Sequence, residues 1–254
     1  MTFLMTTLVI ALLAASIILQ LYTLHKSKRI HLKLFGMENH IEQASDNAIH
    51  QLECLQALYH DLQFSASLPP TRGWAASPDF LLHIARHARN AQPEHIVECS
   101  SGVSTVVLAR AAQLNGKGHV YSLEHDPIYA QKTRDELRRQ GLQDHATVLD
   151  APLETHSIEG TEYRWYRIAG LPLPAAIDCL VIDGPPAAVQ KEVRYPAIPL
   201  LNGLLKSNAR IFLDDAGRPD ELAIVKAWGD KFGWNNTPFV QAEKGIAVLS
   251  RQVA

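Results

Sequence analysis

Acidic side chains follow short apolar stretches at several places between residues 95 and 216, and carboxylates can bind cations, bind polar ligands or accept protons. Apolar stretches of about four to eight residues are typical of buried strands. The carboxyl ends of parallel strands lie at one edge of a sheet, where ligands bind. One such carboxylate can arise by chance or cap a helix, but the repeated pattern predicts a shared site. The residues concerned are Glu98, Glu124, Asp150, Asp183, Asp214 and Asp215.

A loop of small residues, Ser100 to Gly102, follows the first of these stretches and precedes an apolar helical run that ends near Leu114. Small side chains let a ligand approach the main chain, and the first N–H groups of a helix are free to bind its polar atoms. An ordinary strand–loop–helix corner has the same pattern. The loop alone is therefore a weak signal, and it is mainly the carboxylates around it that indicate a ligand-binding site.

Glu124 ends the next apolar stretch, about twenty residues further along the chain. Doubly wound folds place at this distance the carboxylate that binds the hydroxyl pair of a ribose, so an adenosine-bearing ligand is expected. A dinucleotide needs the glycines of the pattern G-x-G-x-x-G against its pyrophosphate. The loop has Gly102 alone, which makes NAD the weaker candidate.

The stretch from His95 to Thr105 resembles motif I of the class I S-adenosylmethionine-dependent methyltransferases, E-x-G-x-G followed by Ser-Thr, with Ser100 where that family more often has glycine. The run S-L-E-H-D-P-I-Y-A resembles the second motif of small-molecule O-methyltransferases of the catechol O-methyltransferase type. The resemblance implies S-adenosyl-L-methionine as cofactor, with Glu124 on its ribose and Asp150–Ala151 at its adenine. The implied cofactor-binding residues are Glu98, Ser100, Gly102, Ser104, Thr105, Glu124, His125, Asp150 and Ala151.

The resemblance also implies a site for Mg²⁺ or another divalent cation. In the metal-dependent relatives, the positions that match Asp183, Asp214 and Asp215 carry Asp, Asp and Asn, and they hold an ion that lowers the pKa of the acceptor hydroxyl. Prolines replace the catalytic lysine of those enzymes, and Lys191 or Arg194 are the candidates for its role. Asp183 and Asp214 are the candidate catalytic residues. Asp183 as a base without metal, or as a structural cap, is the alternative.

Strand-like and helix-like stretches alternate from residue 95 to residue 235, which predicts a parallel sheet with helices on both faces. The resemblance implies the Rossmann-like, doubly wound α/β fold of class I methyltransferases, with a seven-stranded, mostly parallel sheet. Thr237–Ala242 and Gly245–Ser250 are expected to form its closing antiparallel strands.

The first 24 residues contain no charged side chain and are long enough to span a bilayer. We predict a transmembrane anchor, residues 1–24; a cleaved signal peptide is the alternative, although its basic start is missing. Basic residues follow at Lys26, Lys28, Arg29 and Lys33, so the positive-inside rule predicts a single-pass membrane protein with a cytoplasmic domain.

Residues 25–66 are expected to form a basic flank and an amphipathic helical linker, followed by a methyltransferase-like domain at 67–254. Apolar residues recur every three or four positions over residues 34–62. This stripe either packs on the chain's own domain or forms a self-associating stalk that makes a homo-oligomer.

The formal net charge is −2 with neutral histidines, whereas nucleic-acid-binding proteins carry a basic surface, so no nucleic-acid partner is expected. The three cysteines lie far apart among apolar residues, which favours buried free thiols over disulfides.

The loop Gly184–Pro199 lies where an acceptor would bind, and Arg194 and Tyr195 could contact an anionic or sugar-like acceptor; a proline-stiffened connection is the alternative. The overall prediction is an S-adenosylmethionine-dependent methyltransferase that methylates an oxygen of a small-molecule or glycan-like acceptor at the cytoplasmic membrane face. A non-catalytic anchored protein that keeps the fold for ligand or partner binding is the other interpretation.

Overall fold

The structure is a computed structural model that describes residues 2–237 and 242–251. The chain divides into two compact units, residues 1–50 and 51–254, and each is described by itself. Helix α1 (Thr2–Leu62) forms the first unit and contributes its last residues to the second.

The N-terminal part of α1 is apolar and exposed. Its most hydrophobic 18-residue window has a mean hydropathy of 2.4, and none of that window is buried. By length and composition this helix can cross a membrane. A signal sequence near an N-terminus meets the same criteria, so the membrane anchor stays a prediction.

The end of α1, from Gln51 onward, packs in the second unit. Leu58 and Leu62 are fully buried there, against the apolar face of α2 (Pro78–Ala91). This end of the amphipathic stripe therefore packs on the chain's own domain, whereas Met37 and Ile41, further upstream, are exposed.

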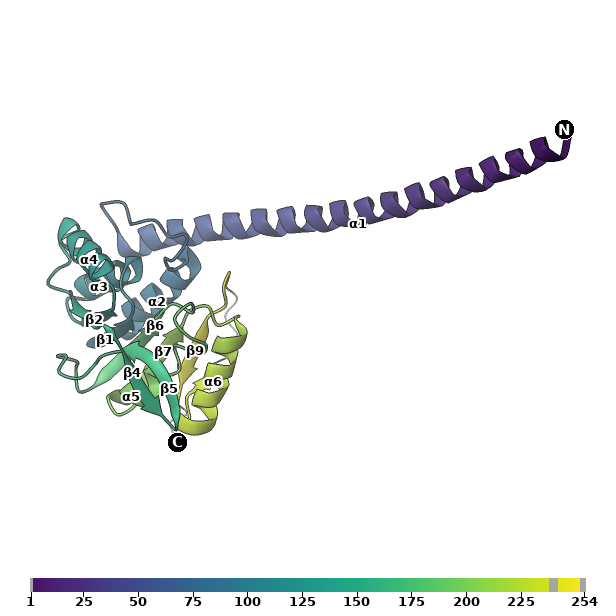
Figure 1. Ribbon diagram of the computed structural model, residues 1–254. Helices are drawn as coiled ribbons and strands as arrows, with labels where there is room; N and C mark the ends of the chain where they lie inside the picture. Colours follow the sequence, from purple (N-terminus) through teal and green to yellow (C-terminus); the bar gives the residue numbers. More distant parts are fainter. Residues whose placement is uncertain (1, 238–241, 252–254) are drawn as a thin grey trace. The chain divides into compact units, whose positions relative to one another are not determined.

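The second unit is built on a twisted sheet whose strand order is β3-β2-β1-β6-β7-β9-β8 (Figure 1). In the part of the chain that the structure describes, this sheet has seven strands, and only the pairs made by β9 are antiparallel. The predicted Rossmann-like, mostly parallel sheet is confirmed. The expected strand 237–242 falls largely outside the described residues. The strands are β1 His95–Cys99, β2 His119–Glu124, β3 Ala146–Asp150, β6 Ile177–Ile182, β7 Leu205–Leu213, β8 Asn235–Asn236 and β9 Ala247–Ser250.

Alternating strand residues face two hydrophobic cores. Ile96 packs with helices on one face of the sheet, and its neighbour Val97 packs on the other. The first face is covered by α2, α3 (Val103–Asn115) and α4 (Pro127–Arg139), and the second by α5 (Ala197–Leu201) and α6 (Pro219–Phe232). Because both faces are covered, apolar residues occupy both faces of the central strands.

A β-hairpin stands between β3 and β6. Its strands β4 (Leu153–Ile158) and β5 (Thr161–Tyr166) pair antiparallel. Glu159 and Gly160 connect them and both have positive φ, 51° and 82°, as a two-residue hairpin turn requires. The sequence signal for this turn is a Gly-containing pair between two runs of alternating residues, but no element was predicted for this segment.

A buried carboxylate, Asp79, joins three segments of the second unit. Its Oδ2 accepts hydrogen bonds from Gln51 Nε2 (2.9 Å) and the Glu243 N–H (2.7 Å), and its Oδ1 accepts from Ser77 Oγ (2.5 Å) and the Phe80 N–H (2.8 Å). Burial alone would raise the pKa of Asp79, but these hydrogen bonds outweigh it and lower the pKa. The carboxylate therefore stabilises the unit in its charged form.

We expect Asp79→Ala to lower the free energy of unfolding by about 3 kcal/mol near neutral pH, because several buried donors lose their acceptor. Since the folded pKa lies below the unfolded one, the stabilisation is present above the unfolded pKa and is lost as pH falls through the folded value. Urea unfolding at decreasing pH should show the free energies of unfolding of the wild type and of Asp79→Ala becoming equal in the acid range.

The matched control is Asp126→Ala, which removes the solvent-facing N-cap of α4 and should cost about 1 kcal/mol. Equal losses for the two variants near neutral pH would contradict the role of Asp79.

Candidate functional site

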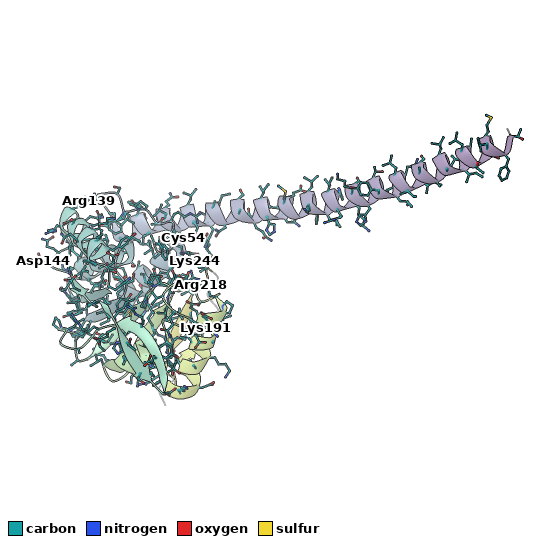
Figure 2. The ribbon with its side chains drawn as sticks, in the orientation of Figure 1. Cys54, Arg139, Asp144, Lys191, Arg218 and Lys244 are labelled. Carbon is teal, nitrogen blue, oxygen red and sulfur yellow. The ribbon has the colours of Figure 1, made fainter. Side chains whose placement is uncertain are left out.

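A cavity of about 1010 Å³ lies at the carboxyl ends of β1, β2 and β6. Ligand pockets typically measure about 300 to 1000 Å³, so this one can hold a cofactor together with an acceptor. Basic residues, among them Arg218 and Lys244, line it beside the acidic ones (Figure 2). The residues predicted from the sequence that line it are Ser100, Gly102, Ser104, Glu124, His125, Asp183, Arg194 and Asp215.

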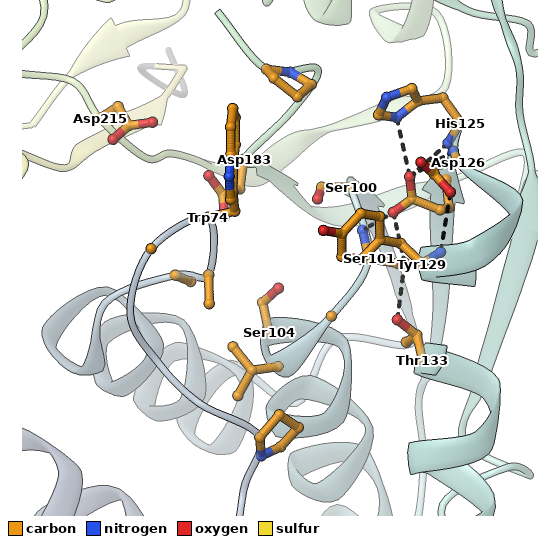
Figure 3. Close-up of a pocket in the computed structure, with 18 of the residues that line it drawn as sticks. Trp74, Ser100, Ser101, Ser104, His125, Asp126, Tyr129, Thr133, Asp183 and Asp215 are labelled. Carbon is orange, nitrogen blue, oxygen red and sulfur yellow. Dashed lines mark hydrogen bonds and ion pairs between the residues drawn. The ribbon is translucent and has the colours of Figure 1, made fainter. Parts of the chain in front are cut away.

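The loop after β1 forms one wall of this cavity (Figure 3). Ser100 and Gly102 have φ angles of +118° and +153°, a region that L side chains rarely adopt. This explains why glycine is more frequent at position 100 in the family that the motif resembles, and Ser100 adopts the conformation at a cost of about 1 to 3 kcal/mol. The first N–H groups of α3, which follows, have no acceptor within the helix.

Glu124 holds this loop from the end of β2. Its Oε2 accepts hydrogen bonds from the Ser101 N–H (3.0 Å) and from Ser101 Oγ (2.7 Å). Its Oε1 accepts from the N–H groups of His125 (2.8 Å) and Asp126 (3.0 Å). Burial would raise the pKa of Glu124, but the bonds from His125, Asp126 and Ser101 outweigh it and lower the pKa. An anionic carboxylate therefore lies in the cavity wall, as the sequence predicts, and it also organises the cradle.

Glu98 lies beneath the loop and does not line the described cavity. Its Oε2 accepts hydrogen bonds from Thr105 Oγ1 (2.6 Å) and Ser122 Oγ (3.0 Å), and the same Thr105 hydroxyl accepts the Gly102 N–H. Burial raises the pKa of Glu98 to about 7. The structure thus places Glu98 and Thr105 as supports of the cradle.

Asp150 and Ala151, predicted near the adenine, lie beside the cavity wall and outside the described lining. Asp150 pairs with Glu124 in the sheet register and forms an ion pair with Arg134 at 2.8 Å. Ala151 is buried, and its N–H donates to the Glu124 carbonyl oxygen at 2.7 Å. These two residues therefore brace the end of β2.

The start of α4 adds lining residues that the sequence motifs did not single out. Tyr129, Lys132 and Thr133 line the cavity. Figure 3 shows Tyr129 and Thr133 on the side of the helix that faces Ser101. The hydroxyl of Thr133 is 3.1 Å from Ser101 Oγ. The exposed ring of Trp74 lines the same cavity from the segment before α2.

Tyr166, at the end of the hairpin, was missed because the hairpin itself was missed. Its hydroxyl is buried, lines the cavity and has no hydrogen-bond partner among the described residues. Burial raises the pKa of Tyr166 well above its usual value, so the hydroxyl stays a donor. A Cβ at position 184 would collide with this hydroxyl, which explains Gly184 directly after Asp183.

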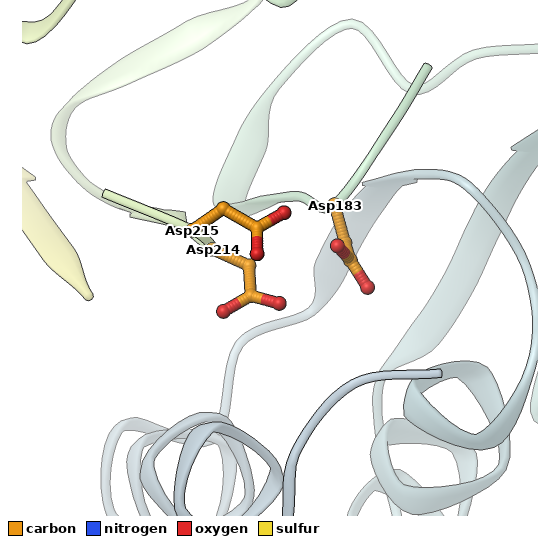
Figure 4. Close-up of side chains that lie close together, drawn as sticks. All are labelled: Asp183, Asp214 and Asp215. Carbon is orange, nitrogen blue, oxygen red and sulfur yellow. The ribbon is translucent and has the colours of Figure 1, made fainter. Parts of the chain in front are cut away.

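The structure brings Asp183, Asp214 and Asp215 together at the ends of β6 and β7 (Figure 4). One oxygen from each carboxylate lies within 4.8 Å of the others. Burial, followed by the charge of Asp214, raises the pKa of Asp183 well above its usual value; burial and then Asp215 raise the pKa of Asp214. Among the three, Asp183 and Asp215 line the cavity, and Asp214 lies behind them.

A buried arginine already balances part of the negative charge of this cluster. Arg194 is 3% exposed, and its Nη2 lies 2.8 Å from Asp215 Oδ2 and 3.4 Å from Asp183 Oδ1. A divalent ion about 4 Å from a guanidinium would meet a repulsion of about 8 kcal/mol at an effective dielectric constant of about 20. Oxygen ligands suit Mg²⁺ in type, and both oxygens of Asp214 lack a partner in the described part of the chain. Because of the guanidinium, this arrangement nevertheless fits a divalent ion poorly.

The two other residues proposed for this loop do not reach the cavity. Lys191 is exposed and lies 3.6 Å from Glu192 (Figure 2), and Tyr195 is buried against Tyr163. Arg194 lines the cavity but is held by the acidic cluster, and Tyr195 packs against Tyr163. Binding of an acceptor by these two residues stays a prediction.

Comparisons with known proteins agree with this fold. Residues 97–216 match a family described as a methyltransferase domain. No curated protein matches the sequence. Among solved structures, the SAH-bound methyltransferase PaMTH1 of Podospora anserina is similar: the identity is 14%, the match covers 84% of this chain and 96% of that one, and the TM-score is 0.56.

Two further solved structures have the same fold. Cofactor-bound Rv0187 from MTB is 21% identical over 78% of this chain and 89% of its own, with a TM-score of 0.53. The O-methyltransferase TomG from Streptomyces achromogenes, in complex with SAM, is 15% identical over 80% of this chain and 89% of its own, with a TM-score of 0.50. Together, the sheet order and the match of residues 97–216 to a methyltransferase domain show the Rossmann-like fold of the class I S-adenosylmethionine-dependent methyltransferases.

Proposed function

We propose that this methyltransferase methylates a hydroxyl oxygen of a small-molecule or glycan-like acceptor at the cytoplasmic face of a membrane. The observation that carries the proposal is the position of Asp183, which lies in the same cavity as the loop after β1 and Glu124. The similarity to the O-methyltransferase TomG supports oxygen as the atom that is methylated.

The cavity residues fit the cofactor. The first-turn N–H groups of α3 and the unpartnered hydroxyl of Tyr166 are donors for its polar atoms. A ribose hydroxyl can donate to Glu124 by replacing Ser101 Oγ, which has Thr133 Oγ1 as a second neighbour. In place of Asp150 and Ala151, the exposed ring of Tyr129 offers a flat surface for the adenine.

When bound, S-adenosylmethionine supplies a methyl group on a sulfonium. Asp183 would orient the acceptor hydroxyl and accept its proton as the oxygen–methyl bond forms. Its raised pKa makes it a stronger proton acceptor than an exposed aspartate. Burial and then the charge of Asp214, which lies outside the cavity lining, raise the pKa of Asp183, so Asp214 would act through Asp183.

Asp183→Asn should lower kcat about a hundredfold or more while cofactor affinity changes little, because the amide keeps the shape and loses the base. Labelled cofactor and a cell extract provide the assay for an acceptor. Asp150→Asn is the matched control, since Asp150 also ends a strand but lies outside the cavity lining. Cofactor binding without methyl release in the wild type would favour a non-catalytic binding protein.

Tyr166→Phe should weaken the binding of S-adenosylmethionine about five- to tenfold, because a donor to the cofactor is lost. The same change should leave the stability of the cofactor-free protein equal or slightly higher, since a buried unpartnered hydroxyl is removed.

Calorimetric titration and urea unfolding measure the two effects separately. Tyr163→Phe is the control on the same strand, because Tyr163 lies outside the described cavity lining and its affinity should match the wild type. Unchanged affinity in Tyr166→Phe would remove Tyr166 from the proposed cofactor site.

Membrane location rests on the apolar start of α1 and the basic residues Lys26, Lys28, Arg29 and Lys33. These charges should stay on the cytoplasmic side. A C-terminal phosphatase reporter that is active only after export should be silent, and a C-terminal reporter that is active only in the cytoplasm should work. The reverse pattern would contradict the topology. Residues 34–50 remain the segment that we propose for self-association, because the apolar residues of their stripe are exposed.

A further inference from the structure

The acidic cluster at the ends of β6 and β7 contains a cation that belongs to the chain. The guanidinium of Arg194 contacts Asp215 Oδ2 at 2.8 Å and Asp183 Oδ1 at 3.4 Å, and its Nε is 3.9 Å from Glu221 Oε1. Its Nη1 donates to the Asp214 carbonyl oxygen at 2.8 Å. The positive charge of Arg194 therefore occupies the position where a metal ion would bind between the three aspartates.

Burial makes this cation a permanent part of the site. The side chains of Arg194 and Glu221 are each 3% exposed, and that of Asp215 is 5% exposed. A guanidinium keeps its charge at all ordinary pH values, and its planar donors match several acceptors at once. Burial would lower the pKa of Arg194, but Asp183, Asp215, Glu221 and Asp214 raise it.

The neighbouring chain prevents Arg194 from swinging out. Tyr195, the next residue, is buried, and its carbonyl oxygen accepts a hydrogen bond from Trp228 Nε1 of α6 at 3.0 Å. If Arg194 left the cluster, the buried carboxylates would lose their positively charged partner, which is energetically costly. The second cation, Arg218, is half exposed and contacts Asp215 at 2.9 Å from the cavity side.

We propose that Arg194 is the built-in cation of this site, standing in the place of the divalent metal of the metal-dependent relatives, so that the wild-type protein neither binds nor needs a divalent ion there. The part that concerns turnover rests on the proposed function, whereas the part that concerns ion binding does not. An internal cation leaves Asp183 facing the acceptor with its charge partly balanced.

The test measures the binding of Mn²⁺ to the full-length protein in detergent. Binding is monitored through the electron paramagnetic resonance signal of the free ion. The wild type should take up no Mn²⁺ at this cluster. Arg194→Met removes the cation and should gain one site, with an affinity at least about tenfold above any residual wild-type binding. Asp214→Asn, added to Arg194→Met, should abolish the new site.

Arg218→Met is the matched control, because it removes the half-exposed cation of the same cluster and leaves the guanidinium of Arg194 in place; it should gain no site. Thermal unfolding supplies a second readout, since Mn²⁺ should raise the Tm of Arg194→Met and leave that of the wild type unchanged. If Arg194→Met does not fold without ions, refolding by Mn²⁺ supports the proposal as well.

Wild-type binding of Mn²⁺ that Asp214→Asn removes would overturn the proposal. Turnover, once an acceptor is found, should continue in excess chelator; a loss that Mg²⁺ restores would overturn it too. If the protein methylates no acceptor, the proposed function is contradicted. The result of the Mn²⁺ titration remains valid in that case.

Discussion

Charge balance in the buried cluster at the ends of β6 and β7 constrains the architecture of the site. Unpaired buried charges are costly, so the carboxylates there require a cation that the protein itself positions. Arg194 meets this requirement from the segment between β6 and α5, and in doing so it fixes that segment across the ends of two strands. The acidic edge of the sheet and the course of the following loop therefore depend on one interaction.

The cavity wall formed by Glu124 and the loop after β1 follows the same rule on a smaller scale. Glu124 uses both oxygens on main-chain N–H groups and a serine hydroxyl, and Glu98 supports the loop from below through Thr105. These bonds hold Ser100 and Gly102 in unusual backbone conformations before any ligand arrives. A cradle that is organised in advance loses less entropy on binding.

The hairpin β4–β5 packs on one face of the sheet. It covers part of one sheet face with Tyr163 and Trp165, which a helix at that place would cover with other side chains. Its last residue, Tyr166, brings a buried hydroxyl into the cavity beside Gly184. The hairpin thus contributes both to the hydrophobic core on this face of the sheet and to the lining of the cavity.

Much of this architecture follows from the sequence, because buried strands are apolar and parallel strands end at one edge. That is why Glu124, Asp183 and Asp215 could be expected in one cavity, and why the sheet and the loop around Gly102 could be predicted from short stretches. The direction of each carboxylate could not be predicted in this way. Glu98 and Asp214 also end strands, yet they point into the protein and support their neighbours.

The partners of long side chains were decided only by the tertiary structure. Arg194 lies eleven residues from Asp183 and more than twenty from Asp215 in the sequence, and nothing local indicates that it fills the space between them. Tyr166 likewise reaches the cavity only because its hairpin folds over the end of β6. Strand periodicity and turn chemistry act over a few residues and can be read from sequence, whereas the neutralisation of buried charge depends on segments that meet only when the whole domain is packed.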